Sequence, residues 1–195
     1  MRTLSHGDVI AALTPAEAVE AIPQPLLDGF DPATDPHRQK VPLPHGEMHL
    51  LPSALGGAVG VKVLGIQPAH SRIDVPLVQG TYLLMGGETL TPELAMDAGA
   101  LTQLRTPAVS VAGVLGRLRA SAEPLECVVL GTGVQGRAHT ETIASALEGV
   151  RDVSFTFVSR HEPAGLRWPW AASGSAEAVA ALGRAGLVVT ATSSS

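Results

Sequence analysis

The sequence predicts an α/β protein in which a mixed α+β N-terminal region precedes a smaller region with a parallel sheet. Two observations lead to this fold class. Short apolar runs separated by glycines follow Glu47, and their spacing of about 10 residues is typical of strands in a sheet. After residue 125, apolar strands alternate with helical segments, which indicates a parallel α/β sheet.

Length and composition limit the possible classes of protein. The chain has 195 residues, enough for one domain and part of another at roughly 100–200 residues per domain. Hydrophobic residues make up 45% and charged residues 16% of the chain, which predicts a folded protein because enough apolar surface can be buried to offset chain entropy. The aromatic content of 3% and the net charge of −5 argue against a nucleic-acid partner.

Cysteine content and hydropathy bear on the compartment. Cys127 is the single cysteine, so no intramolecular disulfide can form, and we expect a buried, small apolar side chain. The first residues contain no long apolar stretch, and no run approaches the roughly 18 apolar residues of a membrane span. We therefore expect a cytoplasmic protein with no membrane partner.

The N-terminal region begins with two predicted helices and a loop. Residues 4–22 have the pattern of a helix pair, the second helix opened by Thr14 as N-cap and Pro15 at the first helical position. Residues 23–46 are rich in proline and predict a loop. The apolar runs that follow predict strands at residues 48–52, 58–65 and 76–87.

Residues 97–119 predict two helices with a break at 105–106. Thr106 and Pro107 repeat the signature of an N-cap followed by a first-position proline, which would place Arg105 at the helix junction. On the second helix, apolar side chains at helical spacing are expected to share one face: Val111, Val114, Leu115 and Leu118.

The C-terminal region follows a polar linker at residues 120–126. The alternation predicts strands at residues 127–131, 153–159 and 187–193, and helices at residues 134–150 and 175–185. Trp168 and Trp170 lie in a short stretch where a crossover helix would be expected. We expect the two tryptophans to form a local hydrophobic patch that covers a sheet face.

A glycine-rich turn joins the first of these strands to its helix: Gly131-Thr132-Gly133-Val134-Gln135-Gly136. In this position glycines permit a tight turn and let backbone N–H groups approach a pyrophosphate at the helix N-terminus. The context predicts a dinucleotide-binding Rossmann domain; a glycine turn needed only for packing is the alternative. Three predicted strands are fewer than the roughly six of a complete domain, so we expect a partial domain, truncated on its C-terminal side.

The end of the second predicted strand bears on the choice of dinucleotide. Domains that bind NAD place an acidic residue there to contact the ribose 2′-hydroxyl. Here the strand ends in Ser159 and Arg160, and a guanidinium suits the 2′-phosphate of NADP because it can donate two hydrogen bonds to phosphate. We therefore favour NADP(H) over NAD(H); the alternative is that Arg160 is a solvated loop residue.

Three cations of the first half lie in apolar or structured settings: Arg38, Lys62 and Arg105. Lys62 interrupts an apolar strand, which is rare unless one face opens on a cavity or supplies a partner charge. If the three side chains converged on one pocket, they would hold a carboxylate. Unrelated surface charges are the alternative that the spacing leaves open.

Five segments in this order resemble the ornithine cyclodeaminase/mu-crystallin family: HRQKVPLPHGEMHLLPSALGGAVGVKVLG, PLVQGTYLLMGGETL, ALTQLRTPAVS, LGTGVQGRAH and VVTATSS. The resemblance extends over essentially the whole chain, and its most specific parts are the LRT segment and the GTGVQ loop. It implies a domain at residues 1–120 that binds substrate and forms a homodimer, followed by an NAD(P)-binding Rossmann domain at residues 121–195.

The resemblance also implies a chemistry and a set of site residues. Members oxidise the amine carbon of an amino acid or reduce the corresponding imine, as ornithine cyclodeaminases, alanine dehydrogenases or ketimine reductases. The positions of Arg38, Lys62 and Arg105 bind the substrate carboxylate in the family. Cofactor contacts are implied at the glycine loop and the ends of the later strands: Gly131, Thr132, Gly133, Val134, Gln135, Ser159, Arg160, Thr190, Ala191 and Thr192.

The sequence departs from the family pattern at several positions. His49 stands where ornithine-cyclising members carry an acidic residue, which argues against ornithine as the specific substrate and makes His49 a candidate proton relay. We expect His139 to be an exposed helix residue. The part of the family's Rossmann domain that carries its catalytic Asp has no counterpart here, so the alternative to an enzyme is a truncated, non-catalytic member that dimerises and binds nucleotide weakly or not at all.

Overall fold

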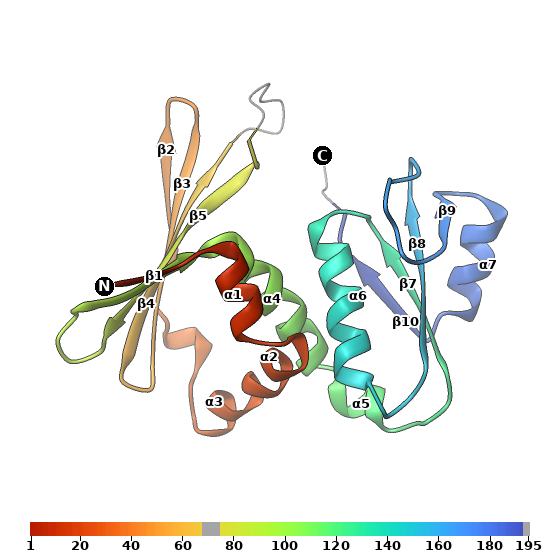
Figure 1. The fold of residues 1–195 in the computed structure, drawn as a ribbon, viewed down its shortest axis with the longest axis horizontal. Helices are drawn as coiled ribbons and strands as arrows, with labels where there is room; N and C mark the ends of the chain where they lie inside the picture. The colour runs from red at the N-terminus through yellow and green to blue at the C-terminus, as the bar shows by residue number, and fades with distance from the viewer. Residues whose placement is uncertain (68–74, 193–195) are drawn as a thin grey trace. The chain divides into compact units, whose positions relative to one another are not determined.

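The computed structural model describes residues 1–67 and 75–192, and the contacts divide them into two compact units (Figure 1). The first unit consists of Met1–Thr14 and Pro23–Thr102, and the second of Pro15–Ile22 and Gln103–Ser195. The division between them lies within helix α4 (Ala98–Ala112), whereas the sequence predicted a domain boundary at residue 120. The difference arises because α2 (Pro15–Ala21) and the segment after Thr102 pack with the second sheet.

The first unit is built on a mixed sheet with the strand order β1-β6-β5-β4-β3-β2. Only β1 and β6 pair in parallel, and the other neighbours pair as antiparallel strands. The predicted strands are confirmed, and β1, β2 and β6 are additional. The elements are β1 (Arg2–Leu4), α1 (His6–Ala12), α3 (Pro23–Leu27), η1 (Pro32–Thr34), β2 (Gln39–Leu43), β3 (Gly46–Leu55), β4 (Ala58–Ile66), β5 (Val78–Gly86) and β6 (Pro92–Asp97).

The loop predicted at residues 23–46 is wrong, because this segment contains α3, η1 and β2. Pro23 and Pro25 lie in the first turn of α3, where a missing N–H costs nothing since the first turn leaves its N–H groups unpaired. Pro42 lies in β2 at the edge of the sheet, where proline is tolerated for the same reason. The prolines therefore mark starts and edges of elements in this segment.

Helix α4 is continuous through the position of the predicted break. Pro107 lies inside the helix and has no N–H to donate to the carbonyl of Gln103. Pro107 is nevertheless fully buried, as are Ala108 and Val111, and this packing offsets the missing hydrogen bond. Arg105 consequently lies within a helix and not at a junction.

The interruption comes instead at Gly113 and Val114, before α5 (Leu115–Arg119). Val111, Leu115 and Leu118 are buried as predicted, but Val114 is 42% exposed, so its assignment to the same face is wrong. Val114 leaves the helical conformation at this turn, with φ −121° and ψ 2°. In the part of the chain that the structure describes, no helix combines the length and hydropathy that spanning a membrane requires.

The second unit contains a parallel sheet with the strand order β10-β7-β8-β9. The described residues form one strand more than the sequence predicted, because β9 has only 3 residues and follows Pro169. The remaining elements are β7 (Leu125–Leu130), α6 (Val134–Leu147), β8 (Val153–Ser159), β9 (Trp170–Ala172), α7 (Ala176–Arg184) and β10 (Leu187–Thr190). Trp168 and Trp170 are partly buried and pack against the core. The rings of Trp168 and Phe155 pack edge-on, with their centroids 5.0 Å apart.

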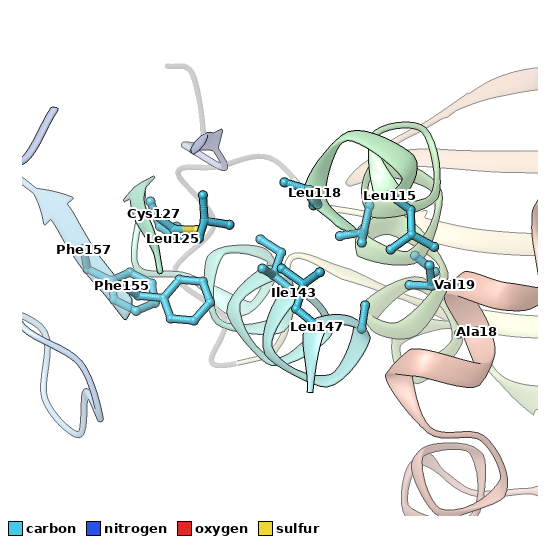
Figure 2. Packing of buried hydrophobic residues seen from close by; sticks show 14 residues of the cluster. Ala18, Val19, Leu115, Leu118, Leu125, Cys127, Ile143, Leu147, Phe155 and Phe157 are labelled. Carbon is cyan, nitrogen blue, oxygen red and sulfur yellow. The ribbon is translucent and has the colours of Figure 1, made fainter. Parts of the chain in front are cut away.

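Helices α6 and α7 cover opposite faces of this sheet (Figure 1). Successive side chains of a strand point to opposite faces, so Cys127 and Val129 contact the cluster under α6 while Val128 belongs to the cluster under α7. In Figure 2, Ile143 and Leu147 of α6 lie between the side chains of β7 and β8 and those of α2 and α5. Cys127 is 1% exposed, and burial raises the pKa of its thiol to about 12, which confirms the expected apolar role.

The core position of Leu147 gives a direct test of this packing. Leu147 is fully buried, whereas Leu27 on α3 is 78% exposed. We expect Leu147→Ala to lower the free energy of unfolding by about 2–5 kcal/mol, because it removes buried apolar atoms and leaves a cavity. Leu27→Ala, the matched control, should change it by less than about 0.5 kcal/mol. Urea denaturation followed by circular dichroism measures both values, and equal losses would contradict the assigned core.

Candidate functional site

A pocket of about 1090 Å³ lies at the carboxyl ends of β7, β8 and β10 in the second unit. The chain passes from β7 to β8 on one side and returns to β10 on the other side of β7, so the strand order reverses beside the pocket. In open α/β sheets, ligands bind at such a reversal point. The lining includes every residue predicted to contact the cofactor: Gly131, Thr132, Gly133, Val134, Gln135, Ser159, Arg160, Thr190, Ala191 and Thr192.

The glycine-rich turn fits between neighbouring loops through its backbone. Gly131 has φ +105°, and its N–H donates to the carbonyl of Val158 at 2.9 Å. A Cβ at Gly131 would overlap the carbonyl of Ala191, and one at Gly136 would overlap the carbonyl of Gly131. Gly133, the N-cap of α6, has open space around it and no side chain to cap the helix. The first N–H groups of α6 thus have no side-chain cap from this position, which suits an anionic ligand.

The segment after β8 forms the next wall of the pocket. The Ser159 hydroxyl donates to the carbonyl of His161 at 2.7 Å and accepts from the Trp170 indole N–H at 2.9 Å. Arg160 is exposed and lines the pocket together with His161. The serine hydroxyl is therefore engaged within the protein, and Arg160 is a charged residue in the lining of the pocket.

Polar groups of two helices complete the lining, and the sequence did not identify them as site residues. His139 of α6 is 7% exposed, so the expected exposure is wrong. Its Nδ1 lies 2.7 Å from the carbonyl of Gln135, and its Nε2 lies 3.4 Å from Ser110 Oγ on α4. Thr106 Oγ1 is buried without a hydrogen-bond partner among the described residues. The four-residue spacing of Thr106 and Ser110 was the available signal, since it puts both on one helix face.

The strand register of the first unit brings two candidate residues to one sheet face. His49 pairs with Leu64, and Leu51 pairs with Lys62, so His49 and Lys62 point to the same side. The pairing of β2 with β3 begins at Gln39, opposite Leu50, so Arg38 precedes the paired residues and is not placed by this register.

Lys62 is 7% exposed, and its Nζ donates to Thr102 Oγ1 on α4 at 3.3 Å. The Thr102 hydroxyl donates in turn to the carbonyl of Ala98 at 2.6 Å. The first turns of α4 therefore lie against the face that carries Lys62. Arg38 is exposed and directly precedes β2. Arg105 belongs to the second unit and is exposed on α4.

Tyr82, a neighbour of Lys62 on this face, was not identified from the sequence. It pairs with Lys62, and its phenol lies over Gly60, where any Cβ would overlap it. Burial, and then the charge of Asp35, raise the pKa of Tyr82, which favours the neutral hydroxyl.

His49 contacts a carboxylate of its own strand. Its Nε2 lies 2.7 Å from Glu47 Oε2. The hydrogen bond to His49 is the main cause that holds the pKa of Glu47 below its usual range. One ring nitrogen of His49 is therefore engaged by Glu47.

Comparison with known proteins adds to this geometry. A sequence model described as the ornithine cyclodeaminase/mu-crystallin family matches residues 9–195. The chain is 27% identical over 117 residues to Delta(1)-pyrroline-2-carboxylate/Delta(1)-piperideine-2-carboxylate reductase of Azospirillum brasilense. This match includes 60% of the chain and 37% of the relative, so the chain spans well under half of that protein.

Two solved structures share the fold. Delta(1)-pyrroline-2-carboxylate reductase of Thermococcus litoralis, in complex with NADH and L-proline, has a TM-score of 0.75 at 23% identity, covering 98% of this chain and 62% of that chain. An archaeal alanine dehydrogenase dimer with bound NAD has a TM-score of 0.76 at 21% identity, covering 98% of this chain and 60% of that chain. At these identities the likeness concerns the fold.

The fit of the glycine turn can be tested by two glycine substitutions. Gly136→Ala should lower the free energy of unfolding by about 1–3 kcal/mol, because the new Cβ overlaps the Gly131 carbonyl. Gly183 on α7 has no atom within 4 Å of a Cβ, so Gly183→Ala should raise this free energy by up to about 1 kcal/mol through helix propensity. Thermal and urea unfolding measure both changes. A gain of stability in both variants would contradict the tight turn.

Proposed function

The chain belongs to the ornithine cyclodeaminase/mu-crystallin family, and we propose on this basis that it is an NAD(P)-dependent oxidoreductase of amino acids and the corresponding imino acids. The observation that carries the proposal is the pocket at the carboxyl ends of β7, β8 and β10, with the glycine turn at its centre. Its volume of about 1090 Å³ is at the upper end of the roughly 300–1,000 Å³ of small-molecule sites, as an extended dinucleotide requires. Because His49 replaces the acidic residue of ornithine-cyclising members, we favour a range of amino or imino acids over ornithine as the specific substrate.

The residues of the pocket fit a nicotinamide dinucleotide. Gly131 and Gly133 leave the backbone at the start of α6 open to a pyrophosphate, and the helix dipole favours its negative charge. Thr106 Oγ1, buried and without a partner among the described residues, offers a hydrogen bond that a bound ligand would satisfy. Thr190, Ala191 and Thr192 would contact the nicotinamide half.

NADP(H) is the proposed form of the cofactor. Arg160 is exposed beside the pocket, where the ribose 2′-phosphate would lie. The Ser159 hydroxyl donates to the carbonyl of His161 and accepts from the Trp170 indole N–H. The strand ends in Ser159 and not in the acidic residue that would bind a ribose 2′-hydroxyl. The guanidinium of Arg160 can bind a phosphate with two hydrogen bonds.

Substrate binding is assigned to Arg38, Lys62 and Arg105, which would hold the carboxylate next to the reacting carbon. Of the three cations, Lys62 would interact most strongly with the substrate carboxylate, because it is buried and a cation removed from water interacts strongly with an anion. When bound, the nicotinamide supplies hydride to an imine carbon or takes it from an amine carbon. His49, hydrogen-bonded to Glu47, would exchange protons with the substrate nitrogen. We also propose a cytoplasmic homodimer.

Oxidation of NADPH in the presence of candidate substrates tests the activity. The panel contains five- and six-membered cyclic imino acids with a 2-carboxylate, and 2-oxo acids combined with ammonia or methylamine. We expect turnover with at least one carboxylated imine and none with the matched imine that lacks the carboxylate. A folded protein that oxidises NADPH with no member of the panel would refute the enzymatic function.

The second candidate is a non-catalytic member of the family that dimerises and binds nucleotide weakly or not at all. Calorimetric titration with NADPH separates the two candidates, since a tight complex that raises the unfolding temperature fits the enzyme. Absence of binding fits the second candidate.

Lys62→Met tests the carboxylate site. The variant keeps the size of a buried side chain, and replacing a buried cation by an apolar group is often neutral for stability. We expect the KM for the carboxylated substrate to rise at least about tenfold, because a hydrogen bond to a charged group is lost. The affinity for NADPH should change less than about twofold. Arg117→Met, which removes an exposed cation of α5, is the control and should leave both values unchanged.

A further inference from the structure

The side chain of Arg137, on α6, makes three hydrogen bonds to backbone carbonyls. Its Nε donates to the carbonyl of Thr132 at 3.2 Å. Its Nη1 donates to the carbonyl of Gly165 at 2.8 Å, and its Nη2 donates to the carbonyl of Ala164 at 2.9 Å. Each of the three guanidinium nitrogens thus donates to a backbone carbonyl, and two of these carbonyls belong to consecutive residues.

These carbonyls belong to two different loops that each contribute residues to the pocket. Thr132 is part of the glycine turn and lines the pocket. Ala164 and Gly165 belong to the 160–169 loop, which joins β8 to β9 and begins with Arg160 and His161 at the pocket. Arg137 itself is not among the lining residues of the pocket. It therefore connects the site that suits the pyrophosphate to the segment that suits the ribose, without reaching the ligand.

The first part of the 160–169 loop has few other attachments among the described residues. Residues 160–165 are exposed except for the half-buried Pro163, and burial in the core cluster resumes with Leu166 and Trp168. The Ser159 hydroxyl bonds to the carbonyl of His161 at the start of the loop. Gly165 has φ +65°, a conformation that glycine adopts without strain. The hydrogen bonds of Arg137 hold the loop at this turn.

We infer that Arg137 is a positioning residue for dinucleotide selectivity: it fixes the 160–165 segment against the glycine turn and so holds Arg160 where a 2′-phosphate would bind. This inference rests on the proposed function, because selectivity requires that the pocket binds a nicotinamide dinucleotide. The planar fork of arginine spans two adjacent carbonyls, which a lysine ammonium cannot do. Without the guanidinium of Arg137, the carbonyls of the loop are solvated and Arg160 samples more positions. The conformational entropy of ordering the loop is then lost when the nucleotide binds, which lowers the affinity.

Arg137→Lys and Arg137→Gln test this role, with Arg119→Lys as the matched control. Arg119 also donates two guanidinium hydrogen bonds to a backbone carbonyl, that of Ala146, but it is not part of the pocket lining. Hydrogen exchange of the 160–166 peptide, measured without nucleotide, reports on the loop. We expect exchange to be at least about fivefold faster in both Arg137 variants and unchanged in Arg119→Lys.

Fluorescence titrations with NADPH and NADH report on selectivity. The ratio of the two dissociation constants should move at least about fivefold against NADPH in both Arg137 variants, because only NADP carries the phosphate that Arg160 would bind. Arg119→Lys should lower thermal stability without moving the ratio. If the Arg137 substitutions acted only through a general structural effect, they would weaken the binding of NADPH and NADH equally.

Three results would overturn the inference, and they are distinguishable from one another. Unchanged exchange of the 160–166 peptide refutes the positioning of the loop, whatever the nucleotides do. Faster exchange with an unchanged ratio refutes the role in selectivity. Failure of the unmodified protein to bind either nucleotide refutes the proposed function and the selectivity with it, while the exchange experiment still shows whether Arg137 orders the loop.

Discussion

The packing of α6 against the parallel sheet is the interaction on which the pocket at the carboxyl ends of β7, β8 and β10 depends. Ile143 and Leu147 are buried against Phe155 and the side chains of α2 and α5, and each such apolar side chain contributes about 1.5–3 kcal/mol on burial. This apolar contact fixes the position of the helix relative to the strands. The N-terminus of α6, and the glycine turn before it, are consequently held at the carboxyl ends of β7 and β8.

The polar parts of the pocket are held by backbone contacts between loops. The Gly131 N–H donates to the carbonyl of Val158 in β8, and the Ala191 N–H donates to the carbonyl of Leu130 in β7, so the segments after β7 and β10 are each held against a neighbouring strand. Arg137 joins the glycine turn to the 160–169 loop. The arrangement explains why the glycines at 131 and 136 leave no space for a Cβ.

Lys62 shows how an exception to a pattern can mark a site. A buried ammonium on an apolar strand costs free energy unless polar groups compensate it, and Thr102 supplies one hydrogen bond. The strand register puts His49 and Lys62 on one face of the first sheet. The sequence alone showed that Lys62 interrupts an apolar strand. That Tyr82 is its cross-strand neighbour is known only from the pairing of β4 with β5.

Local sequence was enough to predict β3, β4 and β5, the strand, turn and helix around Gly131, and helix α7, because each depends on local periodicity or on one residue's backbone preference. The path of α4 through Pro107, the existence of β9 and the burial of His139 depend on the tertiary structure. Their stability comes from contacts with distant residues, which offset a missing hydrogen bond, pair a strand of 3 residues with β8 and enclose an imidazole between two helices. No local pattern contains those contacts, since they exist only after the chain has folded.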